Sequence, residues 1–192
     1  ITKFKAVALP AIILSTVCIC AAGMFVLIDL GGIQRVWRIV TGPNPTSPLF
    51  WDICVITLYL VINVLYLVNR HRGNDHAVSI ISRFALPCAI LVHSVTAWIF
   101  GLQQGHEMWH TALLAPWFVS SALVCGTALV MVVAIGLRKV GYLELDQSYL
   151  VKLAKLLGAF VMGDLYFFGC DLLTEAFPGG SGAEVVAMLV SG

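Results

Sequence analysis

The feature that most constrains this chain is a series of five long apolar runs separated by short polar segments. The runs cover about residues 4–30, 49–69, 78–102, 114–137 and 149–177. A helix of about 20 residues crosses the roughly 30 Å of hydrocarbon in a bilayer. The runs are continuous and lack the period-two alternation of barrel strands, so they favour helices over a barrel. We predict an all-α membrane protein with about five transmembrane helices.

The composition excludes an ordinary water-soluble domain. Hydrophobic residues make up 60% of the chain and charged residues 11%, and the mean hydropathy is +0.96. Chains of average soluble composition are far less apolar, and the loops here are too short to build a separate domain. We therefore expect the lipid bilayer, and no nucleic acid, as a partner.

The six cysteines all fall inside apolar segments and form no C-x-x-C pair. We interpret them as buried thiols that act as small hydrophobic side chains. Cys18 and Cys20 point to different sides of a helix, which is a poor geometry for a shared metal.

Both ends of the sequence suggest a piece of a longer polypeptide. The chain begins at Ile1 without a methionine, and its last apolar run, residues 183–190, is too short to span a bilayer. We expect a fragment from which an earlier helix is missing at the front.

Lysine and arginine residues lie mainly on one side of the predicted membrane. That side carries nine of them, whereas the other carries only Arg35 and Arg38, in the connector 31–48. By the positive-inside rule the nine lie in the cytoplasm, which predicts a multi-pass protein of a prokaryotic inner (cytoplasmic) membrane. The connector, the loop 103–113 and the acidic end of the fifth run then face outward together.

His93 is the histidine that lies well inside an apolar run. At 1.5 Å per residue it sits roughly 12 Å below the outer end of the third run, with Thr96 and Ala97 on the same helical face. A neutral imidazole can accept a proton from a quinol hydroxyl near neutral pH, and polar residues inside membranes are by default functional. The alternative is a histidine that hydrogen-bonds a neighbouring helix.

The outer loop brings His106, Trp109 and His110 close together in sequence. Trp109, with Trp98 and Trp117, fits an interfacial aromatic belt. His106 and His110 would suit a metal if the loop were helical, but Gly105 and the lack of a third ligand weaken that interpretation. A haem is also disfavoured, because transmembrane haems take paired histidines from inside the spans.

Two polar columns run along the predicted helices. Asp164 lies near the middle of the fifth run, and Asp171 and Glu175 fall on roughly the same stripe, which would suit a proton path. The alternative is a carboxyl group satisfied by polar groups of another helix. The second run carries a column at Asp52, Tyr59, Asn63, Tyr66 and Arg70, for which hydrogen bonding between helices is slightly favoured over transport.

Motifs within residues 29–126 point to one family. The segment DLGG-x2-R-x2-R, which begins at Asp29, is followed by NPTSP, HSVTAW and WHTALLAPWFVSSALVCG. This order resembles the NrfD-type membrane subunits of the polysulfide reductase family, and most of all the quinone-interacting subunit of the sulfite-reduction (Dsr) electron-transfer complex. The family's D-L-G-R reads Asp29-Leu30-Gly31-Gly32 here, so the arginine role depends on substitution by Arg35.

The resemblance implies that residues 1–138 form a four-helix bundle with a quinone site and that residues 139–192 begin a second bundle. It implies a bound menaquinone or other quinone, no haem or metal in this chain, a ferredoxin-like iron-sulfur subunit on the outer face, and further membrane and cytochrome subunits. We assign proton handling to His93 and Asp164. The predicted quinone-binding residues are Asp29, Arg35, Thr96, Trp109, His110 and Trp117.

The sequence therefore predicts a subunit of a respiratory complex that exchanges electrons between quinone and an iron-sulfur partner. Two other functions stay open. The polar columns could form a proton or ion pathway, or the chain could be a purely structural membrane anchor.

Overall fold

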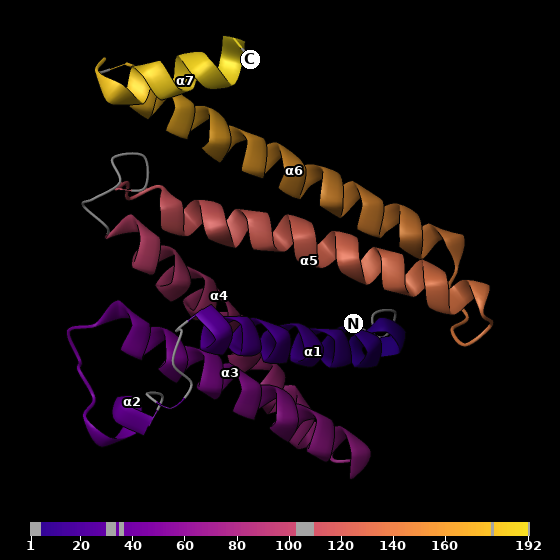
Figure 1. Cartoon of the computed structure of the whole chain (residues 1–192). Coiled ribbons are helices and arrows are strands. Elements are labelled where there is room, and N and C mark those ends of the chain that lie inside the picture. The colour runs from indigo at the N-terminus through magenta and orange to yellow at the C-terminus, as the bar shows by residue number, and fades with distance from the viewer. Residues whose placement is uncertain (1–4, 30–33, 35–36, 103–109, 178, 192) are drawn as a thin grey trace. The chain divides into compact units, whose positions relative to one another are not determined.

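The computed structural model describes residues 5–29, 34, 37–102, 110–177 and 179–191. The secondary-structure elements in this part of the chain are α-helices (Figure 1). The helices are α1 (Lys5–Asp29), α2 (Trp37–Thr41), α3 (Pro48–His71), α4 (Asp75–Gly101), α5 (Leu114–Lys139), α6 (Gln147–Ala176) and α7 (Ser181–Ser191).

Five of the described helices, namely α1, α3, α4, α5 and α6, are long and apolar enough to cross a membrane. Their bounds fall within about three residues of the five predicted runs. Large apolar side chains are exposed along them, including Phe25 at 67%, Phe84 at 64% and Met162 at 69%. In water such exposure would be costly, whereas hydrocarbon solvates it. The predicted all-α membrane fold is confirmed.

Prolines and glycines mark the boundaries of the helices in the described connectors. Pro48 occupies the first turn of α3, where its missing N–H removes no helical hydrogen bond. Gly73 has φ +72° between α3 and α4, a left-handed conformation that disfavours side chains with a Cβ. Arg70 and Asp75 form an exposed ion pair of 3.1 Å across the same turn. The second and third runs are therefore joined by a tight turn.

The described chain divides into two compact units. The first unit comprises Ile1–Thr96 with Val133–Leu143, and the second comprises Ala97–Val132 with Glu144–Gly192. The predicted division between residues 138 and 139 rests on the family resemblance and stays a prediction.

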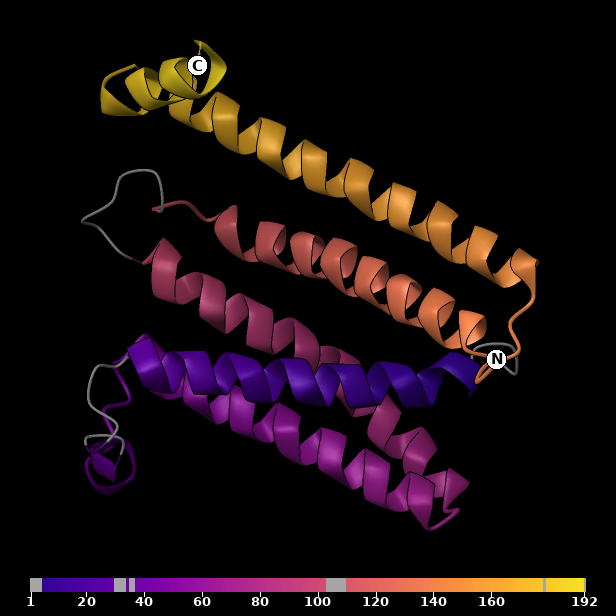
Figure 2. The ribbon, with the colours of Figure 1, turned by 45° about the vertical axis from the view of Figure 1, so that its right-hand side comes forward.

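In the first unit, α1 lies antiparallel to α3 (Figures 1 and 2), and polar side chains join the two helices near their middles. The hydroxyl groups of Ser15 and Tyr59 are 2.8 Å apart, and the amide Nδ2 of Asn63 donates to Ser15 Oγ at 3.3 Å. Asn63 is completely buried, at 0% exposure. The structural interpretation of Tyr59 and Asn63 in the second-run column, hydrogen bonding between helices, is what the structure shows.

In the second unit, α7 packs closely on the end of α6. A Cβ added at Gly182 would lie 2.7 Å from Oε2 and 3.0 Å from the carbonyl oxygen of Glu175. The 11 residues of α7 correspond to a length of roughly 16 Å.

We expect Tyr59→Phe to lower the free energy of unfolding in mixed micelles, because Ser15 loses a partner in a region without water. Hydrogen bonds between membrane helices contribute about 0.6 kcal/mol on average and at most about 1.7 kcal/mol. Tyr66→Phe is the matched control, since no hydrogen bond of the Tyr66 hydroxyl with a described residue is found. Equal losses in the two variants would contradict a specific role for the Ser15–Tyr59 contact.

Candidate functional site

A cavity of about 350 Å³ lies where α4 ends and α5 begins, within the second unit. Its described walls are formed mostly by small and apolar side chains with one imidazole, contributed by Ala97, Trp98, Gly101, Leu102, His110, Thr111, Ala112 and Leu114. The volume falls near the lower end of the roughly 300–1,000 Å³ range of small-molecule sites. The charge count of the sequence predicts that this end of α4 lies at the outward membrane surface.

His110 is held at the cavity by the backbone of α4. Its Nδ1 lies 3.2 Å from the carbonyl oxygen of Gly101, the last residue of that helix. A carbonyl oxygen only accepts hydrogen bonds, so Nδ1 must carry the proton. In the neutral ring Nε2 then has a free lone pair. The backbone thus fixes the tautomer that can accept a proton from a ligand.

The described tryptophans of this region have different surroundings. Trp98 lines the cavity and is 49% exposed. Trp117 does not line it. Its ring packs against Phe168 of α6 with a centroid distance of 5.8 Å. Trp117 therefore joins α5 to α6, and a contact with quinone remains a prediction for it.

The Thr96 hydroxyl group donates a hydrogen bond to a buried carboxyl group. Its Oγ1 lies 2.7 Å from Oδ1 of Asp52 and 2.9 Å from the carbonyl oxygen of Val92. Asp52 is only 2% exposed. It lies in the second turn of α3 and Thr96 near the end of α4, so the contact joins the ends of these antiparallel helices. The predicted role of Thr96 in binding quinone is untested, and its described contacts are structural.

The other predicted residues are spread more widely. His93 is exposed on α4, has no hydrogen-bond partner among the described residues, and does not line the cavity. The side chain of Asp29 and all of Arg35, His106 and Trp109 lie outside the described residues. The structure therefore brings only His110, of the predicted quinone-binding residues that it describes, to this cavity.

The carboxyl groups of α6 follow one stripe that faces α5. Asp164, Phe168 and Asp171 are separated by four and three residues, which places them on the same helical face. Phe168 contacts Trp117, and a Cβ at Gly163 would lie 3.8 Å from Ser120 Oγ of α5. Within the described chain, Oδ1 of Asp164 and Oδ1 of Asp171 are buried without a hydrogen-bond partner. Asn63 Oδ1 of the first unit is also buried without a described partner, and such oxygens are costly in an apolar layer.

No three metal-ligating side chains (His, Cys, Asp or Glu) come close enough to hold a metal ion within the described residues. Of the pair His106 and His110, which the sequence analysis considered for a metal, His106 lies outside the described residues.

Two groups that hold predicted site residues in place, the Gly101 carbonyl and the Asp52 carboxyl, were not recognised in this role from the sequence. The Gly101 carbonyl carries no side-chain signal, although the end of a helix always leaves carbonyl groups in need of donors. Asp52 was placed in a polar column, but its pairing with Thr96 depends on how α3 and α4 rotate toward each other. The sequence signal that could have indicated this pairing was the position of Asp52 and Thr96 near the neighbouring ends of two predicted helices.

Comparisons with known proteins point in one direction. A family model described as "Polysulphide reductase, NrfD" matches residues 1–192. A putative membrane subunit of dimethyl sulfoxide reductase from Halobacterium salinarum is 33% identical over 198 residues, covering 91% of this chain and 46% of the relative. No solved structure matches the chain significantly.

Two further relatives are membrane or complex subunits by name. The Hdr-like menaquinol oxidoreductase integral membrane subunit of Archaeoglobus fulgidus is 27% identical, over 92% of this chain and 45% of the relative. A selenate reductase subunit of Mesobacillus selenatarsenatis is 26% identical, over 89% of this chain and 49% of the relative. The chain thus spans about half the length of the curated relatives it matches.

We expect Thr96→Val to destabilise the α3–α4 pair by about 1–3 kcal/mol, because it removes the hydroxyl that donates to a buried Asp52 oxygen. Thr96→Ser keeps the hydroxyl and is the control. Unfolding in mixed micelles, followed by tryptophan fluorescence, measures both variants. A valine variant as stable as the serine variant would show that the Asp52–Thr96 contact contributes little.

Proposed function

The chain belongs to the polysulphide reductase NrfD family, and on that premise we propose that it exchanges electrons between membrane quinone and a partner iron-sulfur subunit. It does so as an integral membrane subunit of a respiratory oxidoreductase. Menaquinone is the quinone we favour, since one relative is named a menaquinol oxidoreductase subunit.

The observation that carries this proposal is the cavity at the end of α4 with His110 in its wall. Its volume of about 350 Å³ suits an aromatic head group, while an isoprenoid tail would extend into the surrounding lipid. Ala97, Leu102 and Leu114 supply an apolar wall, and Trp98 supplies an aromatic one. A ring with polar oxygens on its edge matches a pocket of this kind.

Oxidation of a quinol releases two electrons and two protons, and His110 is placed to accept one of the protons. Gly101 holds the Nδ1–H, so the lone pair of Nε2 is the free acceptor. The proton moves from a quinol hydroxyl to Nε2, and the imidazolium then passes it to water at the membrane surface. The electrons pass to the partner's cluster on the outward side.

The remaining predicted residues keep their assignments as proposals. His93 and Asp164 are proposed to handle protons, and Asp29, Arg35, Thr96, Trp109 and Trp117 to shape the quinone site. The geometry favours His110 over His93 for direct contact, because His110 lines the cavity and His93 does not.

The wider complex is also a proposal. The relatives are named as subunits of dimethyl sulfoxide reductase, selenate reductase and menaquinol oxidoreductase systems, which supports a multi-subunit complex with a ferredoxin-like iron-sulfur partner. Additional cytochrome subunits and a specific place in sulfite reduction (Dsr) follow from the motif resemblance alone.

We expect His110→Asn to slow menadiol-dependent reduction of the partner's cluster roughly a hundredfold, as loss of a general base does. The shorter amide keeps a donor for the Gly101 carbonyl but has no acceptor at the position of Nε2. The rate is measured by stopped-flow absorbance of the cluster in the purified complex.

His71→Asn, at the exposed cytoplasmic end of α3, is the control for loss of a histidine and should leave the rate unchanged. Full activity of His110→Asn in an assembled complex would remove His110 from proton transfer. If His93→Ala also kept full activity, a structural anchor would become the better description of the chain.

The stripe on α6 favours a second function, a proton pathway that accompanies quinol oxidation. Asp164 and Asp171 are two turns apart, and each has a buried oxygen without a described partner. A chain of water molecules would supply the missing hydrogen-bond partners of both groups. The stripe leads from the middle of α6 toward its outward end at Glu175.

We expect Asp164→Asn to retain quinol oxidation while lowering the pH gradient that the reconstituted complex generates to the part that the quinol protons alone produce, because an amide cannot relay a proton. A pH-sensitive dye inside proteoliposomes measures the gradient. Glu184→Gln, which changes a carboxyl on α7 away from the stripe, is the control. An undiminished gradient with Asp164→Asn would exclude this stripe as the path.

A further inference from the structure

The cavity where α4 ends and α5 begins, which we call the α4–α5 cavity, has a second polar group in its wall beside His110. Thr111 directly follows His110 in the chain and lines the same cavity, whose other described walls are largely apolar. The Thr111 side chain is half-buried. A hydroxyl group in an apolar wall can orient a ligand that carries oxygens.

The hydroxyl hydrogen of Thr111 is not used within the described chain. Thr111 Oγ1 accepts the backbone N–H of Leu113 at 3.2 Å, in the turn that leads into α5. A hydroxyl group has two lone pairs and one hydrogen, so this bond takes one lone pair and leaves the hydrogen free. No acceptor for that hydrogen is found among the described residues. Thr111 therefore supplies a free donor whose oxygen is held by the backbone.

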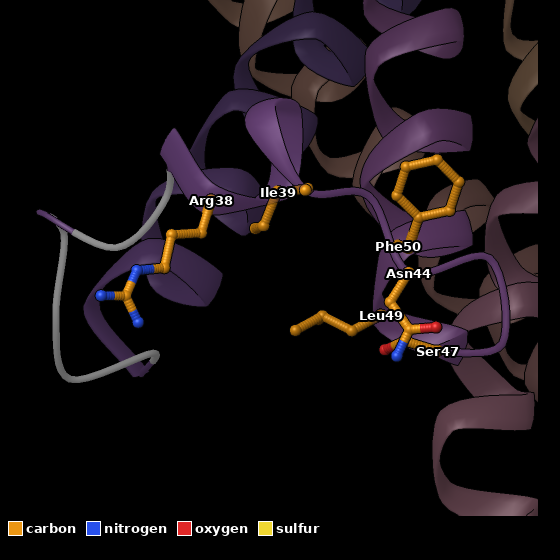
Figure 3. A pocket seen from close by; sticks show the side chains of 7 residues that line it. Arg38, Ile39, Asn44, Ser47, Leu49 and Phe50 are labelled. Carbon is orange, nitrogen blue, oxygen red and sulfur yellow. The ribbon is translucent and has the colours of Figure 1, made fainter.

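A second cavity, of about 210 Å³, lies in the first unit between α2 and the start of α3, and its polar groups are arranged differently (Figure 3). Arg38, Asn44 and Ser47 are its polar side chains. Figure 3 shows the Arg38 guanidinium extending away from Asn44 and Ser47, so these groups do not point toward one ligand. The α4–α5 cavity instead takes its imidazole and its hydroxyl from consecutive residues.

The two groups in the α4–α5 cavity complement each other toward the two redox forms of a quinone. His110 Nε2 presents a lone pair, because the Gly101 carbonyl holds the hydrogen on Nδ1. A lone pair can bind the O–H of a quinol but not the carbonyl oxygen of a quinone, which only accepts. The Thr111 hydroxyl can donate to a ring oxygen of either form. With Thr111, the oxidised form also finds a partner in an otherwise apolar cavity.

We propose that the Thr111 hydroxyl donates a hydrogen bond to a ring oxygen of the bound quinone and positions the head group in the α4–α5 cavity. This inference rests on the proposed function, since the cavity must take a quinone. It adds a binding residue that serves both redox forms, whereas the proton is exchanged at His110. Thr111 transfers no proton itself.

The test measures the affinity of the quinone-depleted complex for a dimethylnaphthoquinone by isothermal titration calorimetry. We expect Thr111→Val to weaken binding about fivefold, as loss of one neutral hydrogen bond does. Thr111→Ser keeps the hydroxyl group and should bind like the wild type. Thr174→Val is the control for loss of a threonine hydroxyl, because Thr174 donates to the Cys170 carbonyl on α6 and does not line the cavity.

Infrared difference spectra of the quinone with isotope-labelled carbonyl carbons separate this contact from a structural role of Thr111. A hydrogen bond lowers the C=O stretching frequency, so one carbonyl band should move to higher frequency in Thr111→Val and stay in place in Thr111→Ser. Thr111→Asp keeps an acceptor for the Leu113 N–H, but its ionised carboxylate has no hydrogen to donate. This variant should show the same band shift and bind at least as weakly as the valine variant, with the start of α5 intact.

Each contrary result has a distinct meaning. Unchanged affinity and an unchanged band in Thr111→Val and Thr111→Asp would overturn the role of Thr111 and leave the quinone site standing. Weaker binding without a band shift would show that Thr111 only shapes the turn before α5, which would also overturn it. Trp98 supplies another donor in the wall, its indole N–H, so a band shift in Trp98→Phe alone would assign the contact to Trp98 instead. Absence of quinone binding by the wild type would overturn the proposed function together with this inference.

Discussion

The absence of water in hydrocarbon is the constraint on which this structure depends. Apolar side chains gain little by leaving lipid for another helix, so the specific contacts must come from packing and from polar groups that need partners. In the first unit these partners are Ser15, Tyr59 and Asn63 between α1 and α3, and Asp52 with Thr96 between α3 and α4. Each bond is modest in energy, but leaving either partner unpaired in lipid costs more than the bond itself contributes. The helices are therefore oriented by the need to pair these groups.

The sequence predicted the elements of this fold well, because hydropathy and length are properties of each segment alone. All five spans were placed to within about three residues, and the polar column of α3 was recognised from its spacing. The prediction that Asn63 and Tyr59 form hydrogen bonds between helices was also correct. The short helix α2 was not predicted within the connector 31–48, because five residues carry too little periodicity to define a helix.

The candidate site was harder to predict, since contacts between helices depend on rotation and on backbone groups without a sequence signature. Thr96 and Trp117 stay predicted quinone-binding residues, and the contacts described for them, with Asp52 and Phe168, could not be predicted from the sequence. His93 drew most weight because it lies deepest in an apolar run, but depth alone does not show which way a side chain points. His110 is placed by a backbone carbonyl that any residue at position 101 would offer.

The carbonyl that orients His110 also has a consequence for reversibility. A neutral ring with hydrogen on Nδ1 takes up a proton at Nε2, and the charged ring can return that proton to an oxygen in the same place. The Gly101 carbonyl can accept the Nδ1 hydrogen bond before and after such a transfer, so the proposed site would serve quinol oxidation and quinone reduction equally. Nothing in this arrangement favours one direction of proton transfer over the other. The direction of net reaction is then set by the difference in reduction potential between the quinone and its electron partner, so one membrane scaffold can serve complexes that run in opposite senses.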